Sequence, residues 1–312
     1  MALVQARGLS KSFRGKPAVR DLSFDVLPGT VTGFLGPNGA GKSTTMRLML
    51  GLDNGGGVTT YDGVPYRELA APLRHVGALL EAKPFHPTRR AANHLRMLAA
   101  SNRIPRTRVD EVIGLVGLAD VADAKPKTFS LGMGQRLGLA AALLGDPDTL
   151  VLDEPANGLD PQGVYWLRGF LKLLAGEGRS VLVSSHLLSE MALLADSIVV
   201  IGRGALIASG KIADFIAVSG HRSVVVRSDE PDRLVAELGR REAEVRRLDG
   251  GALEVRGAGL DSDAVGRLAF DLGLRILELT NREPTLEEVF LEATGASEEF
   301  RASLGIGPGG PR

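Results

Sequence analysis

Short apolar runs alternate with amphipathic stretches along the first two thirds of the chain. Runs of the length of a buried strand occur at residues 31–35, 76–80, 150–152, 181–184 and 198–201. Helical spacing of apolar residues fills most of the intervals between them. Strands that alternate with helices favour a largely parallel sheet covered on both faces. The pattern therefore predicts an α/β fold.

The strand pattern stops between about residues 88 and 145. Apolar positions in this interval recur at helical spacing through residues 91–100, 109–118 and 135–144. We interpret this segment as a helical subdomain inserted into the α/β layer.

A third pattern begins near residue 220. An apolar run (SVVVR), a helical stretch, a hairpin that turns at residues 249–251, a second helical stretch and a last strand (RILELT) follow one another. This order, β-α-β-β-α-β, is that of a split βαβ or ferredoxin-like domain. We therefore expect a first domain over residues 1–217, a small α+β domain over residues 218–298, and a flexible Gly- and Pro-rich tail over residues 299–312.

Composition narrows the possible functions. The 312 residues are 44% apolar, carry 37 basic and 37 acidic side chains, and include no cysteine. Disulfides, thiolate metal sites and cysteine nucleophiles are therefore excluded, and a zero net charge argues against a nucleic-acid partner. No apolar run approaches the ~18 residues of a membrane span, and no signal peptide is apparent. We expect a cytosolic protein that, if it acts at a membrane, does so through another chain or through one face of its own.

A glycine-rich segment carries the clearest chemical signal. Residues 36–44 read GPNGAGKST and satisfy G-x-x-x-x-G-K-S/T, between an apolar strand and a helix. Such a loop offers backbone N–H groups and a helix N-terminus to a triphosphate, with the lysine at the β- and γ-phosphates and the serine hydroxyl on Mg²⁺. The expected nucleotide-binding residues are Gly36, Pro37, Asn38, Gly39, Ala40, Gly41, Lys42, Ser43 and Thr44.

A pair of carboxylates follows the apolar strand at residues 149–152. Asp153 and Glu154 are adjacent, so their side chains point in different directions from a strand end. This suits Asp153 as a ligand of the metal and Glu154 as the group that polarises the attacking water.

Three further segments, FSLGMGQR at 129–136, NGLDP at 157–161 and SSH at 184–186, complete a series. With the phosphate loop they resemble the ATP-binding cassette of ABC transporters, over about residues 3–210. On this resemblance, Ser130 and Gly132 belong to the signature segment, Asp160 to the D-loop, and His186 is the switch histidine, beside the γ-phosphate and the attacking water. Phe13 takes the place of an aromatic that stacks on adenine.

The resemblance implies an ATPase that uses ATP and Mg²⁺ and works as a head-to-tail dimer with a second copy of the chain. Each ATP would lie between the phosphate loop of one subunit and the signature segment of the other. Ser130 and the start of the helix after it can offer a hydroxyl and N–H groups to the γ-phosphate.

The sequence departs from the family pattern at two places. Phe129, Leu131 and Met133 replace the usual signature residues, and Leu131 is bulky where the family mostly has glycine. Glu81 stands where the family usually has a glutamine that touches Mg²⁺ and the attacking water. Our hypothesis is that Glu81 keeps this metal and signalling role with an altered rate.

The form of these departures, and the segment PTLEEVFL at residues 284–291, resemble cassettes of bacterial drug-resistance and other ABC-2-type exporters. This implies a separate transmembrane permease, a location on the cytoplasmic side of the membrane, and a docking face near Glu81 to Met97. An ABC ATPase not coupled to transport is the alternative, but such proteins usually carry two cassettes or a long coiled coil. A small-molecule kinase or GTPase would leave the signature and D-loop unexplained, and an N-K-x-D guanine reader is absent from the sequence.

Overall fold

The computed structural model describes residues 2–81, 85–218, 223–257 and 259–282. Contacts divide the chain after Ile212 into two compact units. This division falls at the start of helix α8 (Ile212–Val218), whereas the sequence predicts a boundary at residues 217/218, at the end of the same helix. In the described part, no helix is both long and apolar enough to cross a bilayer.

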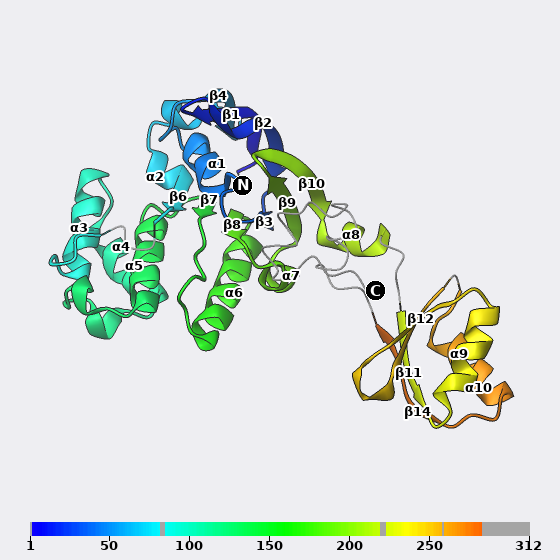
Figure 1. Cartoon of the computed structure of the whole chain (residues 1–312). Helices are drawn as coiled ribbons and strands as arrows, with labels where there is room; N and C mark the ends of the chain where they lie inside the picture. The colour runs from blue at the N-terminus through cyan, green and yellow to red at the C-terminus, as the bar shows by residue number, and fades with distance from the viewer. Residues whose placement is uncertain (1, 82–84, 219–222, 258, 283–312) are drawn as a thin grey trace. The chain divides into compact units, whose positions relative to one another are not determined.

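A six-stranded sheet forms the centre of the first unit, in the order β10-β9-β3-β8-β7-β6 (Figure 1). Five neighbouring strands run parallel and β10 runs antiparallel to β9. The five apolar runs in the sequence thus all form strands of one parallel sheet, as predicted. The strands are β3 (Val31–Leu35), β6 (Val76–Leu79), β7 (Thr149–Leu152), β8 (Ser180–Ser185), β9 (Ser197–Gly202) and β10 (Ala205–Lys211).

Helices of different lengths connect these strands. Because β3, β7 and β8 run in the same direction, their carboxyl ends lie at the same edge of the sheet. The segments that follow these three strands are the phosphate loop, the carboxylate pair and the SSH segment. The helices outside the inserted subdomain are α1 (Lys42–Met49), α2 (Pro72–His75), α6 (Pro161–Gly176) and α7 (Leu188–Leu194).

An antiparallel sheet in the order β2-β1-β4-β5 packs on this layer. Phe24 of β2 and Phe34 of β3 stack with ring centroids 5.3 Å apart, so the two sheets share one core. The apolar runs in the sequence do not predict this sheet. Its strands are β1 (Val4–Phe13), β2 (Lys16–Val26), β4 (Gly56–Tyr61) and β5 (Val64–Pro65), with the short helix η1 (Tyr66–Glu68) after β5.

The carbonyl of Ala18, in β2, lies in a narrow space between two glycines. A Cβ atom added to Gly41 or to Gly204 would lie 2.5 Å from this oxygen. The amide of Arg20 also donates to the carbonyl of Gly204, at 2.7 Å. The antiparallel sheet and the phosphate loop are therefore in direct backbone contact.

The predicted helical subdomain is confirmed. Figure 1 shows its three main helices grouped at one side of the first unit. They pack through apolar faces, as their spacing of buried residues requires. They are α3 (Ala91–Ser101), α4 (Arg106–Leu115) and α5 (Leu131–Leu143), with the short helices η2 (Ala119–Val121) and η3 (Pro126–Thr128) between α4 and α5.

The second unit has the predicted β-α-β-β-α-β order, with an antiparallel sheet arranged β12-β13-β11-β14. The two helices contribute Leu234, Leu238, Val265 and Leu268 to its separate core. The predicted tail and the PTLEEVFL segment lie outside the described residues. The elements are β11 (Ser223–Ser228), α9 (Pro231–Arg240), β12 (Glu244–Arg247), η4 (Asp249–Gly251), β13 (Leu253–Arg256), α10 (Ser262–Asp271) and β14 (Ile276–Arg282).

Candidate functional site

The phosphate loop connects β3 to α1 and depends on glycine at close approaches. Gly41 has φ 107°, and a Cβ atom there would meet the carbonyl of Ala18. A Cβ on Gly36 would lie 2.6 Å from the carbonyl of Ile201. Larger residues at these two positions would therefore displace the loop. In the present conformation the loop backbone can contact an anion.

Lys42, the first residue of α1, is 6% exposed. Its Nζ donates to the carbonyls of Gly36 at 2.7 Å and Pro37 at 3.4 Å, and lies 3.5 Å from Oε1 of Glu154. The ammonium group is thus held over its own loop, next to the second of the two carboxylates. Ser43 is exposed at the same helix start.

Ser184 connects the Asp153 carboxylate to the backbone of Glu154. Its hydroxyl donates to Oδ1 of Asp153 and accepts from the backbone N–H of Glu154 at 2.8 Å. Ser184 is only 1% exposed and lies in β8, the strand next to β7. Ser184 belongs to the SSH segment, but the sequence alone does not indicate this role.

Glu154 lies between a cation and an imidazole. Its backbone has φ 47°, a conformation that non-glycine residues seldom adopt. Oε2 lies 2.9 Å from Nδ1 of His186, while Oε1 faces Lys42. The unusual backbone turns the carboxylate toward the edge of the sheet where the phosphate loop lies, and strain of this kind is common at functional sites.

The donor set at this edge fits a hard divalent cation. The Ser43 hydroxyl and the Asp153 carboxylate are oxygen ligands of the kind that Mg²⁺ prefers, together with phosphate oxygens. No group of three or more His, Asp or Glu side chains in the described part could hold a metal alone. The residues therefore suit a cation that arrives with a phosphate ligand.

Glu81 and Phe13 are two further candidate residues of the sequence. Glu81 follows β6 and is exposed. The pKa of Arg47 is raised, mainly by its hydrogen bond to Asp53 and the Asp53 charge, and to a smaller extent by Glu81. Phe13, at the end of β1, is 49% exposed, and Nζ of Lys11 lies 5.1 Å from its ring centroid.

The signature and D-loop residues sit at the starts of two helices. Ser130 caps α5, and its hydroxyl accepts from the N–H of Met133 at 3.2 Å. Asp160 caps α6 and accepts from the N–H of Gly163 at 2.8 Å. Side chains at such positions satisfy helix N–H groups, and the helix start favours anions. Gly132 lies in the first turn of α5.

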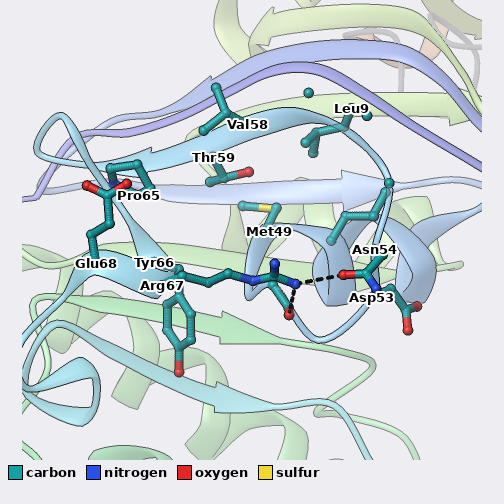
Figure 2. Close-up of a pocket in the computed structure, with 15 residues that line it drawn as sticks. Leu9, Met49, Asp53, Asn54, Val58, Thr59, Pro65, Tyr66, Arg67 and Glu68 are labelled. Carbon is teal, nitrogen blue, oxygen red and sulfur yellow. Dashed lines mark hydrogen bonds between the residues drawn. The ribbon is translucent and has the colours of Figure 1, made fainter.

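A pocket of about 310 Å³ lies elsewhere, between the end of α1 and the β4–β5 hairpin. Figure 2 shows Arg67 reaching across it to Asn54, with hydrogen bonds of 2.9 Å to Oδ1 of Asn54 and to the carbonyl of Gly51. None of residues 36–44 lines this pocket. It is therefore separate from the expected nucleotide site.

Fold and site together define an ATP-binding cassette ATPase, and comparison with known proteins agrees. The family model described as ABC transporter matches residues 19–157, and a domain of unknown function matches residues 222–287. The chain is 38% identical over 301 residues to the uncharacterized ABC transporter ATP-binding protein YhcH of Bacillus subtilis (strain 168), covering 95% of this chain and 97% of the relative. The chain therefore belongs to the family of ABC transporter ATP-binding proteins, which bind and hydrolyse ATP.

Two further comparisons extend this result. The bacitracin transport ATP-binding protein BcrA of Bacillus licheniformis is 31% identical over 307 residues, covering 94% of this chain and 97% of the relative. The dimeric post-hydrolysis structure of the ATP-binding cassette MJ0796, bound to ADP and Pi, has the same fold. Its TM-score is 0.61 at 22% identity, with 67% of this chain and 98% of that chain covered.

Proposed function

We propose that the chain is the ATP-hydrolysing subunit of an exporter. In this proposal two copies pair head to tail on ATP and drive efflux through a separate ABC-2-type permease, from the cytoplasmic side of the membrane. The observation that carries it is the series from Lys42 through Glu154 to His186, formed where three parallel strands end. The relative named as a bacitracin transport protein supports the exporter class.

Glu154 is the proposed general base. The attacking water would give a proton to this carboxylate while its oxygen bonds to the γ-phosphorus, and the bond from that phosphorus to the ADP oxygen would break. His186 holds Oε2 of Glu154 at 2.9 Å and would sit beside the water and the γ-phosphate. Lys42 would leave the loop carbonyls and bind the β- and γ-phosphates.

Ser43 and Asp153 are the proposed protein ligands of Mg²⁺, with Glu81 as a third ligand near the attacking water. The cation would neutralise charge on the phosphate oxygens. Ser184 supports this role, because its bond to Asp153 fixes one carboxylate oxygen and leaves the other for the metal. Phe13, half exposed at the end of β1 in the antiparallel sheet, would stack on adenine.

The second copy would complete each site. Ser130, Gly132 and Asp160 lie at helix starts, where N–H groups and the helix dipole favour a phosphate brought by another subunit. The dimeric MJ0796 cassette bound to ADP and Pi is a structural precedent. The permease would dock near Glu81 to Met97, because this segment follows the proposed nucleotide-sensing loop.

The experiment that tests this function is a trap of the ATP-bound state. Glu154→Gln with ATP and Mg²⁺ should run as a dimer in size-exclusion chromatography with light scattering, and as a monomer without ATP. Tagged chain should also co-purify from membranes with a transmembrane protein. A monomer under all conditions contradicts the dimer, and a purification without a membrane partner favours the ATPase that is not coupled to transport.

A further inference from the structure

Two leucines and two glycines interlock where the start of α5 meets the D-loop. A Cβ atom built on Gly158 would lie only 1.9 Å from Cδ2 of Leu131. In the opposite direction, a Cβ on Gly132 would lie 3.2 Å from Cδ2 of Leu159. Each leucine thus fills space that a glycine of the facing segment leaves open.

Gly158 suits this contact for two independent reasons. Its φ of 78° is in the left-handed region, which favours glycine. It also lacks the side chain that would collide with Leu131. An alanine there would meet both a strained backbone and a filled space.

A hydrogen bond also joins the start of α5 to the D-loop. Gln135 is 4% exposed, and its Nε2 donates to the carbonyl of Asn157 at 3.4 Å. Residues four apart lie on one face of a helix, so Leu131 and Gln135 turn the same face of α5 toward the D-loop. The contact is therefore an extended junction rather than one chance approach.

We propose that Leu131 is a positioning residue whose side chain, seated over Gly158, sets the spacing between the signature segment and the D-loop of the same subunit. This inference rests on the proposed function, in which Ser130 and Asp160 take part in the composite nucleotide site. Ser130 precedes Leu131 directly, and Asp160 follows Gly158 by two residues. The bulky residue in the signature and the glycine in the D-loop are then a matched pair.

The test is a double-mutant cycle in the full chain: Gly158→Ala, Leu131→Ala and both together. With alanine at both positions, the nearest contact becomes the Cβ of Leu131 at 3.5 Å, an ordinary van der Waals distance. Gly158→Ala should lower kcat about tenfold with KM for ATP within about twofold, because the phosphate loop is untouched. Leu131→Ala alone should lower kcat only about threefold, because it loosens the spacing without creating a clash, and the double variant should recover to within about twofold of Leu131→Ala.

Gly63→Ala is the matched control for backbone strain. Gly63 has φ 82° and no atom within 4 Å of an added Cβ, so kcat should stay unchanged. The inference is overturned if Gly158→Ala has normal kcat, or if the double variant is as slow as Gly158→Ala. Coupling in the thermal unfolding midpoint without coupling in kcat would also overturn it, because the pair would then be structural only.

A Lys42→Ala variant in the same assay separates this inference from the proposed function. If Lys42→Ala still hydrolyses ATP at the wild-type rate, the measured activity does not come from the proposed site and the proposed function fails. If Lys42→Ala is inactive and the cycle shows no coupling, only the role of Leu131 fails.

Discussion

Nζ of Lys42 lies 3.5 Å from Oε1 of Glu154, with the lysine side chain 7% exposed and the glutamate side chain 25% exposed. The cation that should meet the phosphates is thus paired with the carboxylate that should activate water. A triphosphate that enters this site must take Lys42 over from Glu154 and from two loop carbonyls. Binding of the nucleotide and release of the carboxylate are therefore expected to be coupled.

Lys42→Ala should weaken ATP binding at least about tenfold, since a charge-assisted hydrogen bond contributes roughly 1.5–3 kcal/mol. Titration calorimetry or a fluorescent ATP analogue measures the affinity. Lys172→Ala, on the exposed face of α6, is the control and should bind like the unchanged chain. Equal affinity in Lys42→Ala would refute the assignment of the loop.

Glu154→Gln should keep ATP binding and lose about 100-fold or more in turnover, the scale of a general base. The amide keeps the shape of the side chain but does not accept a proton at neutral pH. Phosphate release at saturating ATP gives the rate, and Glu177→Gln, an exposed residue after α6, is the control. Fast hydrolysis by Glu154→Gln would exclude this residue as the base.

Ser184→Ala should lower kcat about tenfold, because its hydroxyl binds the Asp153 carboxylate and the backbone N–H of Glu154, and misplaced catalytic groups lose rate steeply. The concentration of Mg²⁺ needed for half-maximal activity should rise, since Asp153 loses its fixed orientation. Ser185→Ala is the neighbouring control, because its hydroxyl bonds to the backbone of Leu187. A normal rate and normal Mg²⁺ dependence in Ser184→Ala would show that the bridge has no role in hydrolysis.

Glu81→Gln should change basal or permease-stimulated ATPase, because it replaces a negative charge near the expected phosphates with a neutral amide. We expect a change of about threefold or more if the residue contacts the metal or the attacking water. Glu68→Gln, an exposed residue of η1, is the control. Unchanged rates under both conditions would remove Glu81 from the site.

His94 is expected to make the stability of the helical subdomain depend on pH. Burial, and to a smaller extent the charge of Arg89, lowers the pKa of His94, which is 5% exposed on α3. Because the folded-state pKa lies below the unfolded value of about 6.5, stability should be retained above that value and fall as the pH drops below it. Thermal melts from pH 8 down to about pH 5 measure this, and His94→Gln should flatten the dependence. An identical slope in both proteins would contradict it.

The sequence predicts the parts of the fold that local pattern determines. The parallel strands are continuous apolar runs and the phosphate loop is one contiguous motif, so both can be predicted from the sequence alone. The sheet of β1, β2 and β4 was missed because its pairing contains register shifts, which break the alternation of apolar and polar residues.

Ser184 shows a second limit of the sequence. Its bond to Asp153 depends on the parallel register in which Leu152 lies opposite Val183. In this register the residues that follow them, Asp153 and Ser184, lie next to each other. Nothing within the SSH segment specifies that neighbour. The position of Leu131 is similar, because the glycine that accommodates it lies 27 residues further along the chain.

The carbonyl of Ala18, enclosed by Gly41 and Gly204, has a mechanical consequence. A displacement of β2 reaches the phosphate loop through backbone alone, without a rotatable side chain to absorb it. A partner that displaces the outer antiparallel strands would therefore change the affinity for ATP without contacting the nucleotide.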